Sequence, residues 1–342
     1  MKKFIMMATT VALSVGMLAG CGQSSSSDAS SNAETSTAEA DGDSISVVTT
    51  IFPEYDWVRQ LVGDTSNVDL TMLVDSGVDL HSYQPSAEDV VKIGEADMFI
   101  YVGGESDEWV EDALEGASNK DMVVINLLDV LGDDVSEEEV VEGMEAEEEE
   151  EEGEAAEGEE EEVEYDEHVW LSLKNAVTLC GAIEEGLEKI DADNAEAYQT
   201  NLANYVAQLE DLDNQYQSAV DSAEVKTVLF GDRFPFRYLV DDYGLDYYAA
   251  FVGCSAESEA SFETITFLAQ KVDELGLTSI LQIESADGEI AETIKNNTES
   301  KDQQILTMDS MQSTTAEDVE NGATYLSAME KNLEVLTQAL SK

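Results

Sequence analysis

Short apolar runs alternate with helix-like patterns in two separate stretches of this chain, and this alternation limits the folds open to it more than any other feature. The first stretch spans 44–126. Its predicted strands are 46–52, 68–74, 98–102 and 122–127. Its predicted helices are 55–62, 87–96 and 108–115. The strands are flat apolar runs without strict alternation, which is typical of a parallel sheet buried on both faces.

The second stretch repeats the pattern after 224. Its predicted strands are 225–230, 247–252, 278–283 and 304–308. Its predicted helices are 235–243, 262–275, 289–296 and 316–340. Strands that alternate with helices indicate a layered α/β architecture. We therefore predict the α/β fold class with two lobes, each a parallel sheet flanked by helices.

The segment between the two stretches predicts one long, rigid helix. No proline occurs from 171 to 223, and Tyr198, Leu209 and Tyr216 belong to an apolar series that recurs every three or four residues. This spacing is that of an amphipathic helix of about seven turns, at about 3.6 residues per turn. Because a helical connection resists bending, we expect only modest movement of the lobes.

These patterns divide the chain into five predicted parts. They are a signal peptide at 1–20, a disordered tether at 21–44, an N-terminal lobe at 45–190 with an acidic insertion at 137–167, a linking helix at 191–224 and a C-terminal lobe at 225–342.

The charge of the chain excludes one class of partner. Its 77 acidic and 15 basic residues give a formal charge of −62, and a nucleic-acid binder needs the clustered Lys and Arg that are missing here. Of the 31 residues in the acidic insertion, 20 are Asp or Glu and none is Lys or Arg. This run either raises the local concentration of divalent cations or is only a solvated spacer, and the sequence leaves both open.

The N-terminus predicts export. Lys2 and Lys3 precede a mostly apolar stretch at 4–18, which fits a secretory signal. The stretch ends in Leu-Ala-Gly-Cys at 18–21, which resembles the lipobox of bacterial lipoproteins. The resemblance implies cleavage before Cys21 and a lipid on its thiol; the alternative is an ordinary cysteine near a conventional cleavage site. We expect an extracytoplasmic protein whose anchor in the cell membrane is this lipid.

Two further cysteines, Cys180 and Cys254, lie in different halves of the chain. An exported compartment permits a disulfide between them, but sequence alone cannot place them within bonding distance. They are either a disulfide or two buried thiols.

The two histidines are the strongest candidates for chemistry. His81 lies in a loop between a predicted strand and a helix that begins after Ser86, and His168 lies between the acidic run and the next helix. Loops that follow parallel strands gather at the carboxyl edge of the sheet, where ligands bind. His81 therefore belongs at that edge, within reach of His168.

At these residues the chain resembles the zinc and manganese solute-binding lipoproteins of ABC transporters. The motifs that carry the resemblance are Thr-Ile-Phe-Pro-Glu-Tyr at 50–55, His81 with Gln-Pro-Ser at 84–86, Ala-Asp-Met-Phe-Ile-Tyr-Val-Gly-Gly at 96–104, His-Val-Trp-Leu-Ser at 168–172 with Asn-Ala at 175–176, Tyr-Gly-Leu at 243–245, Thr-Tyr-Leu at 324–326 and Asn-Leu at 332–333. The resemblance implies two α/β lobes joined by a long helix, with one metal site in the cleft between them.

The resemblance makes His81 and His168 the first two metal ligands. The family's third ligand, a His or Glu, falls on Arg233, whose permanently charged side chain cannot bind a metal. Asp232 takes this place if the turn shifts by one residue; otherwise no ligand comes from this turn, and the two side chains form a structural ion pair. Asp309 matches the family's final carboxylate, and Glu284 is expected as a further ligand or as an acceptor that orients a histidine.

Imidazoles with carboxylates suit Zn²⁺ and also admit the harder Mn²⁺. The position of the acidic run before His168, where zinc members of the family often carry a His-rich loop, favours zinc. We expect a capture protein without enzymatic activity that delivers the ion to an ABC permease with its ATPase and acts as a monomer. The alternatives are a manganese-specific protein of the same kind, a metal-dependent surface hydrolase and an adhesin.

Overall fold

Two parallel sheets form the framework of the protein. The computed structural model describes residues 44–65, 67–145, 164–255 and 259–341. The first sheet contains β1 (Ile45–Thr49), β2 (Val68–Met72), β3 (Met98–Tyr101) and β4 (Val123–Asn126) in the order β2-β1-β3-β4. The second contains β5 (Thr227–Arg233), β6 (Asp246–Phe251), β7 (Ser279–Ile283) and β8 (Gln304–Met308) in the order β6-β5-β7-β8. All neighbouring strands are parallel, which confirms the predicted fold class.

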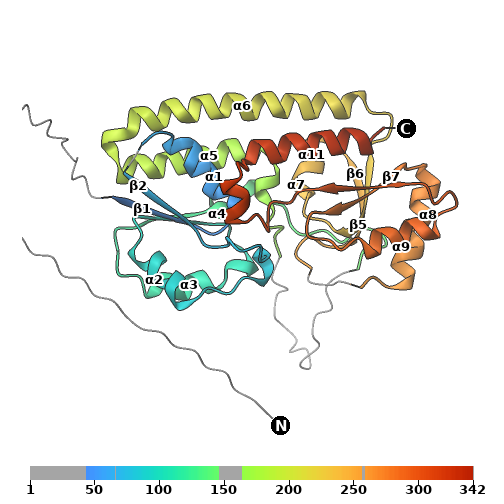
Figure 1. Cartoon of the computed structure of the whole chain (residues 1–342), viewed down its shortest axis with the longest axis horizontal. Coiled ribbons are helices and arrows are strands. Elements are labelled where there is room, and N and C mark those ends of the chain that lie inside the picture. Colours follow the sequence, from blue (N-terminus) through green and yellow to red (C-terminus); the bar gives the residue numbers. More distant parts are fainter. Residues whose placement is uncertain (1–43, 66, 146–163, 256–258, 342) are drawn as a thin grey trace, which may run out of the picture. The chain divides into compact units, whose positions relative to one another are not determined.

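Helices cover both faces of the first sheet (Figure 1). They are α1 (Phe52–Val62), α2 (Ala87–Glu95), α3 (Trp109–Glu115), α4 (Leu127–Leu131) and α5 (Leu173–Ile190). Successive strand side chains point to opposite faces: Val47 joins the core with α1 and α5, whereas Val48 joins a smaller core with α2 and α3. Burial on both faces explains why these strands read as continuous apolar runs.

The second sheet is covered in the same way. Its helices are α7 (Arg237–Tyr243), α8 (Phe262–Leu275), α9 (Glu289–Asn297), α10 (Ala316–Glu320) and α11 (Tyr325–Ala339). The prediction of one helix over 316–340 was wrong, because two helices occupy that range. Gly322 has φ +98, which a helix does not allow, and Thr324 caps a new helix by accepting from Ser327 N.

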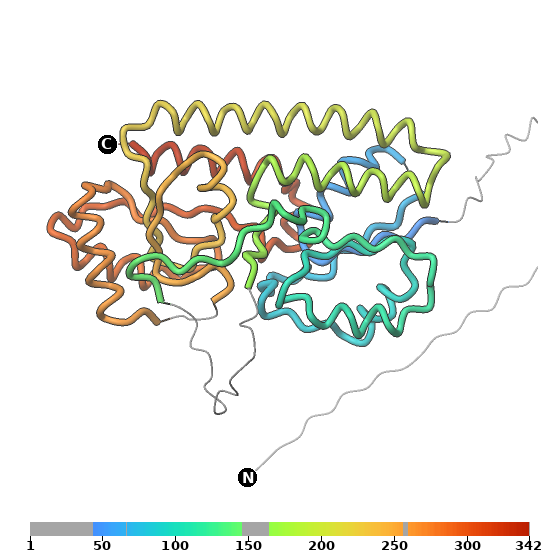
Figure 2. Tube along the Cα trace, turned by 180° about the vertical axis from the view of Figure 1, so that it is seen from behind, coloured from blue at the N-terminus to red at the C-terminus, as the bar shows by residue number. Residues whose placement is uncertain are grey.

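The long helix α6 (Ala195–Ser222, 28 residues) extends past both sheets, with α5 and α11 beneath it (Figures 1 and 2). Its buried side chains include Tyr198, Leu209 and Tyr216, as the periodicity predicts. The Tyr216 hydroxyl donates to the Met329 carbonyl of α11 at 2.6 Å. The helix is thus packed along its length, which stabilises it beyond its own helix propensity.

The cores of the two lobes are continuous. Tyr325 at the start of α11 packs edge-on against Trp57 of α1, with ring centroids 5.2 Å apart. Its backbone N–H donates to Asp56 Oδ2 at 2.7 Å, and its hydroxyl donates to the Trp170 carbonyl at 2.6 Å. These buried contacts hold the two lobes together. The predicted modest lobe movement stays a prediction.

The acidic insertion is closed at its base by backbone pairing. Glu138 N donates to the Glu164 carbonyl at 2.9 Å, and Asp166 N donates to the Ser136 carbonyl at 3.0 Å. Glu145 N donates to the Ala250 carbonyl, so the strand leading into the insertion lies against the second lobe. Only 146–163 of the acidic run lie outside the described residues.

The predicted signal peptide and Cys21, the predicted lipidation site, lie outside the described residues, as does the tether except for Ser44. Across the described ranges, every helix is too short or too polar to cross a bilayer. The predicted division into five parts stays a prediction.

Candidate metal centre

His81 is held in a single turn of 3-10 helix, Leu80–Ser82, that follows β2. Asp79 caps this turn, because its Oδ1 accepts from His81 N at 3.1 Å. Leu80 is fully buried in the core and anchors the turn from the other side. The imidazole therefore projects from a fixed backbone at the carboxyl edge of the first sheet, as its position after a parallel strand predicts.

His168 is fixed by its own neighbours in sequence. It is fully buried, and Asp166 Oδ1 accepts from both its backbone N and its ring Nδ1 at 2.9 Å. The turn Val169–Leu171 follows, and Ser172 then caps α5. Because an ionised carboxylate only accepts, His168 donates through Nδ1, and in the neutral ring Nε2 carries the lone pair.

The two histidines meet through their Nε2 atoms, which are 3.1 Å apart. His81 Nδ1 lies on the far side of its ring, 2.7 Å from Ser106 Oγ and 3.4 Å from Glu167 Oε2. Two imidazole nitrogens bound to one tetrahedral Zn²⁺ at about 2.0–2.1 Å would be about 3.3 Å apart. The observed spacing is close to that value, and carboxylates behind both rings are the usual partners of metal-binding histidines.

Gln312, which follows β8, connects this pair to the loop of His81. With its amide nitrogen 3.2 Å from both carboxylate oxygens of Asp79, its amide oxygen faces His168 Nε2 at 2.8 Å. The Gln312 amide oxygen and His81 Nε2 then both face His168 Nε2. The lone pairs of these atoms repel one another, and a proton or a metal ion between them removes this repulsion.

The surroundings of the pair are acidic. Burial by itself raises the pKa of Glu167, but its interactions with His81 and Ser106 outweigh this and lower it, which favours the carboxylate. Burial, with the nearby charge of Glu167, raises the pKa of Asp107 to about 7. Arg233 forms an ion pair with Asp79 and compensates that one charge. Asp166 and Glu167 remain to attract a cation to the histidines.

A cysteine completes this cluster. Ligand atoms of His81, His168 and Cys254 all lie within 4.8 Å of one another, and this is the group of potential metal ligands found among the described residues. Cys254 follows β6, so it comes from the second lobe. Cys180 and Cys254 are free thiols, so the structure contains no disulfide between them. The topological rule that indicated His81 applies equally to Cys254, but we used it only for the histidines.

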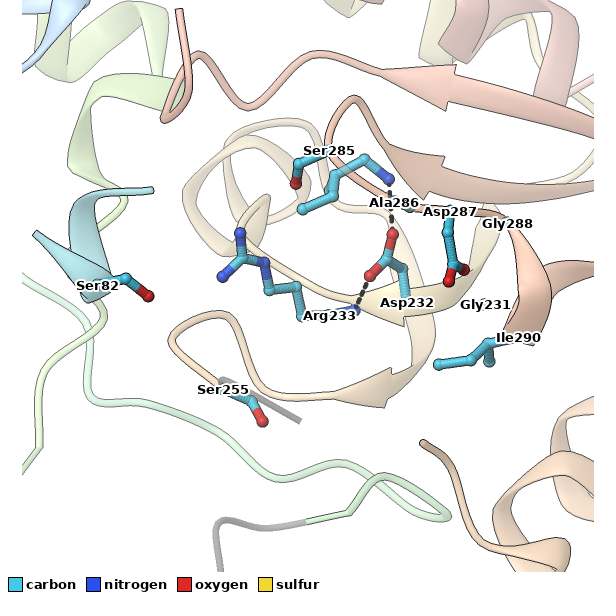
Figure 3. A pocket seen from close by; sticks show the side chains of 11 residues that line it. Ser82, Gly231, Asp232, Arg233, Ser255, Ser285, Ala286, Asp287, Gly288 and Ile290 are labelled. Carbon is cyan, nitrogen blue, oxygen red and sulfur yellow. Dashed lines mark hydrogen bonds between the residues drawn. The ribbon is translucent and has the colours of Figure 1, made fainter. Parts of the chain in front are cut away.

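Asp232 lies apart from this cluster, in a neighbouring cavity of about 340 Å³ (Figure 3). Its Oδ2 accepts from Ile283 N at 3.0 Å and its Oδ1 from Arg233 N at 2.9 Å. The Arg233 side chain extends from the same strand and pairs with Asp79, not with the Asp232 carboxylate. Burial raises the pKa of Asp232, which disfavours its charged form.

Glu284 and Asp309 follow β7 and β8 at the predicted edge of the sheet, but their carboxylates are also engaged. Glu284 accepts from Ser310 N at 2.7 Å, from Ser310 Oγ at 2.8 Å and from Ser313 Oγ at 3.2 Å. Asp309 Oδ1 accepts from Met311 N at 2.9 Å. Burial raises the pKa of both groups, and the charge of Asp309 adds to the effect on Glu284. Both line a cavity shared with Lys331.

A cavity of about 430 Å³ leads to the cluster from the base of the acidic insertion. Its lining residues are His81, Glu105, Ser106, Glu108, Glu138, Glu164, Tyr165, Glu167 and Cys254. Five of these are glutamates, and none is Lys or Arg. A cavity with one sign of charge concentrates ions of the other sign, so this one favours cations.

Known proteins share this architecture. The family described as zinc-uptake complex component A, periplasmic, matches residues 47–339. Zinc-binding lipoprotein AdcA of Streptococcus pneumoniae (strain ATCC BAA-255 / R6) is 34% identical over 300 residues, covering 86% of this chain. The chain spans only 55% of that relative's length.

A second relative matches nearly end to end. The high-affinity zinc uptake system protein ZnuA of Bacillus subtilis (strain 168) is 30% identical over 324 residues, covering 95% of this chain and 94% of that protein. Among solved structures, the Zn(II)-bound ZnuA-like domain of Streptococcus pneumoniae AdcA has a TM-score of 0.67 and 28% identity. That match covers 87% of this chain and 100% of the domain.

Proposed function

Because the chain belongs to the periplasmic zinc-uptake component A family, we propose that it captures one divalent transition-metal ion, zinc in preference to manganese, for uptake into the cell. This membership confirms the resemblance predicted from the sequence motifs. The protein binds and releases the ion and catalyses no reaction. Relatives named as zinc-binding and zinc-uptake proteins, one of them solved with Zn(II), support this choice of metal.

One observation carries the proposal: the Nε2 atoms of His81 and His168 face each other at 3.1 Å, each with a carboxylate behind its ring. Packed core histidines have no reason to direct two such nitrogens at one point. A metal ion bound there gains two imidazole ligands that are already oriented, so little ordering remains to oppose binding.

The predicted carboxylate ligands Asp232, Glu284 and Asp309 stay proposals. Each ends or follows a strand at the edge that faces the first lobe. Each already accepts hydrogen bonds from backbone or serine groups, which hold its carboxylate in place. A carboxylate keeps further lone pairs while it accepts such bonds, so these contacts leave coordination possible.

We place the protein outside the cytoplasmic membrane, with Cys21 as its lipid anchor and an ABC permease with its ATPase as the recipient of the ion. The printed descriptions of relatives as lipoprotein and periplasmic component support the location. A monomer suffices, because both lobes of one chain reach the site.

The test is zinc affinity in His81→Ala and His168→Ala, measured by competition with a chelator, with Lys92→Ala on the exposed face of α2 as the control. We expect a loss of orders of magnitude in each histidine variant, with unchanged helix content by circular dichroism. Binding should also weaken below about pH 6, because protons compete for imidazole nitrogens, whose ordinary pKa is about 6.5. Unchanged affinity in either variant would remove that histidine from the site.

The enzyme and adhesin alternatives have their own readouts. A hydrolase needs turnover of model esters or phosphates by the zinc-loaded protein. An adhesin with a structural metal would not deliver zinc to the permease. Capture and delivery are supported if two results agree. Cells that carry the His168→Ala variant should lose zinc uptake, and the zinc-loaded unaltered protein should not hydrolyse the model substrates.

A further inference from the structure

We infer that Cys254 is a metal ligand, which binds the captured ion as a thiolate from the second lobe beside His81 and His168. This inference rests on the proposed function and specifies the site: two imidazoles from one lobe and one sulfur from the other. The observation that carries it is the convergence of these three ligand atoms within 4.8 Å.

The fold places Cys254 at this point. It follows β6, the edge strand of the second sheet, which pairs with β5. The preceding residue, Gly253, allows the close approach, because a Cβ there would lie 2.8 Å from His168 Cε1 and 2.9 Å from the Phe234 carbonyl oxygen.

The second lobe needs such a ligand. At the position on β5 where a ligand was expected, Arg233 has no lone pair for a metal and instead pairs with Asp79. Both oxygens of its neighbour Asp232 accept from backbone N–H groups. Cys254, in the turn after the adjacent strand β6, is the second-lobe side chain whose ligand atom already lies with the histidines.

The geometry and the charge are suitable for zinc. Tetrahedral Zn²⁺ with bonds of about 2.0–2.1 Å to nitrogen and about 2.3 Å to sulfur sets N···S distances of about 3.6 Å, so the sulfur needs only a small shift. As the metal–sulfur bond forms, the thiol proton leaves to solvent. The thiolate offsets one of the two positive charges, and Asp166 and Glu167 behind the histidines offset the rest.

A sulfur ligand has a consequence for selectivity. Thiolate is a soft ligand that favours Zn²⁺, whereas Mn²⁺ prefers oxygen donors. The Cys254 sulfur therefore makes the site more selective for zinc over manganese than a carboxylate in the same place would. Removing it should lower zinc affinity much more than manganese affinity.

The experiment uses the full chain in detergent micelles under reducing conditions. Its three cysteines provide matched controls: Cys254→Ser is compared with Cys21→Ser and Cys180→Ala. Cys180 is fully buried in the first lobe, so its variant tests for a general effect of removing a thiol. Zinc binding is measured first, and the zinc is then replaced by Co²⁺ for absorption spectroscopy.

We expect one tightly bound zinc ion and a sulfur-to-cobalt charge-transfer band in the near ultraviolet that only Cys254→Ser abolishes. Loss of an outer-shell partner of a metal ligand already lowers metal affinity by about 10–100-fold. Because Cys254→Ser removes a direct ligand, its zinc affinity should fall by at least as much. The ratio of zinc to manganese affinity should fall in parallel.

Two results overturn the inference in distinguishable ways. Tight zinc binding without a sulfur-to-cobalt band, or with a band that survives in Cys254→Ser, removes Cys254 from the site and leaves the proposed function standing. Absence of tight zinc binding by the unaltered chain removes the proposed function, and the inference with it.

Discussion

At the scale of single residues, the candidate site depends on the groups behind its ligands. Asp166 accepts from both the backbone and the ring of His168, and Glu167 and Ser106 lie behind His81. These acceptors determine which ring nitrogen carries the hydrogen and leave the other available for the proposed metal ion. The suitability of the two histidines as ligands therefore depends on this setting.

The first residue-scale prediction concerns Asp166. In Asp166→Asn, the side-chain oxygen can still accept both hydrogen bonds from His168, but the negative charge behind the imidazole is lost. We expect zinc affinity to fall by about 10–100-fold without loss of the fold. Chelator competition measures this, with Asp69→Asn on β2 as the exposed control. Equal affinities in the two variants would contradict the role of Asp166.

The second residue-scale prediction concerns Asp107, which is buried and accepts from Gly103 N at 3.0 Å. Burial and the charge of Glu167 raise its pKa to about 7, so the folded state holds its proton more tightly than the unfolded chain does. Stability from this group is therefore fully present below about pH 4 and is lost as pH rises to about 7.

The amide in Asp107→Asn does not titrate, so the variant does not lose stability through this group as pH rises. The free energy of unfolding of the variant, relative to that of the unaltered protein, should therefore rise between about pH 4 and pH 7, by at most on the order of 4 kcal/mol. Urea unfolding of metal-free protein at several pH values gives this difference directly. A difference that stays constant across that range would show that Asp107 ionises normally in the folded state.

At the scale of elements, α5 shows how one helix packs closely on a sheet. Its two glycines have different surroundings. A Cβ on Gly181 would meet no atom within 4 Å, whereas one on Gly186 would lie 2.8 Å from Met98 Cε and 3.1 Å from Ile125 Cδ1. Gly186 thus permits the close contact between α5 and the strands β3 and β4.

We therefore expect opposite effects from the same substitution in this helix. Gly181→Ala should stabilise the protein by about 0.5–1 kcal/mol, because alanine loses less backbone entropy in a helix. Gly186→Ala gains the same amount but overpacks a buried layer, at a cost of typically about 1–3 kcal/mol. Thermal unfolding of the two variants measures the difference, and equal melting temperatures would contradict this account of the packing.

At the scale of the whole molecule, the described flanks of the acidic insertion lie next to the candidate metal site. The described flanks of the insertion are anchored: Arg237 pairs with Glu139 at 2.6 Å, and the Tyr238 hydroxyl donates to the Asp166 carbonyl at 2.7 Å. A deletion that reached Glu138 and Glu164 would break the backbone pairing beside His168. The clean boundaries for a deletion are thus 146 and 163.

Replacing 146–163 with a short Gly/Ser linker should leave one tight zinc ion and remove weak additional binding. A same-length control with Gln at every Glu of this range separates charge from length. Added salt should abolish the weak binding in the unaltered protein, since exposed charges act over about 8 Å at physiological ionic strength. Loss of the tight site would instead mean that the insertion supplies ligands.

How much the sequence predicts differs between the fold and the site. All eight strands lie within a few residues of their predicted positions, because a parallel sheet buried on both faces requires continuous apolar runs. The break between α10 and α11 was missed, since apolar spacing continues across it and only Gly322 and the Thr324 cap indicate it. Local patterns identify elements well and their interruptions poorly.

What the sequence determines by itself is set by local chemistry: the alternating elements, the long helix α6, and the placement of His81 and His168 in loops at the ligand-binding edge. What only the tertiary structure decides is which side chains meet across the lobes. Cys254 lies 86 residues after His168 in the chain, and its approach depends on sheet order and on the space beside Gly253. Asp232, Glu284 and Asp309 have the right residue types, but their carboxylates lie outside the group of ligand atoms that His81, His168 and Cys254 form. Coordination depends on which ligand atoms converge after packing, and packing is a property of the whole fold.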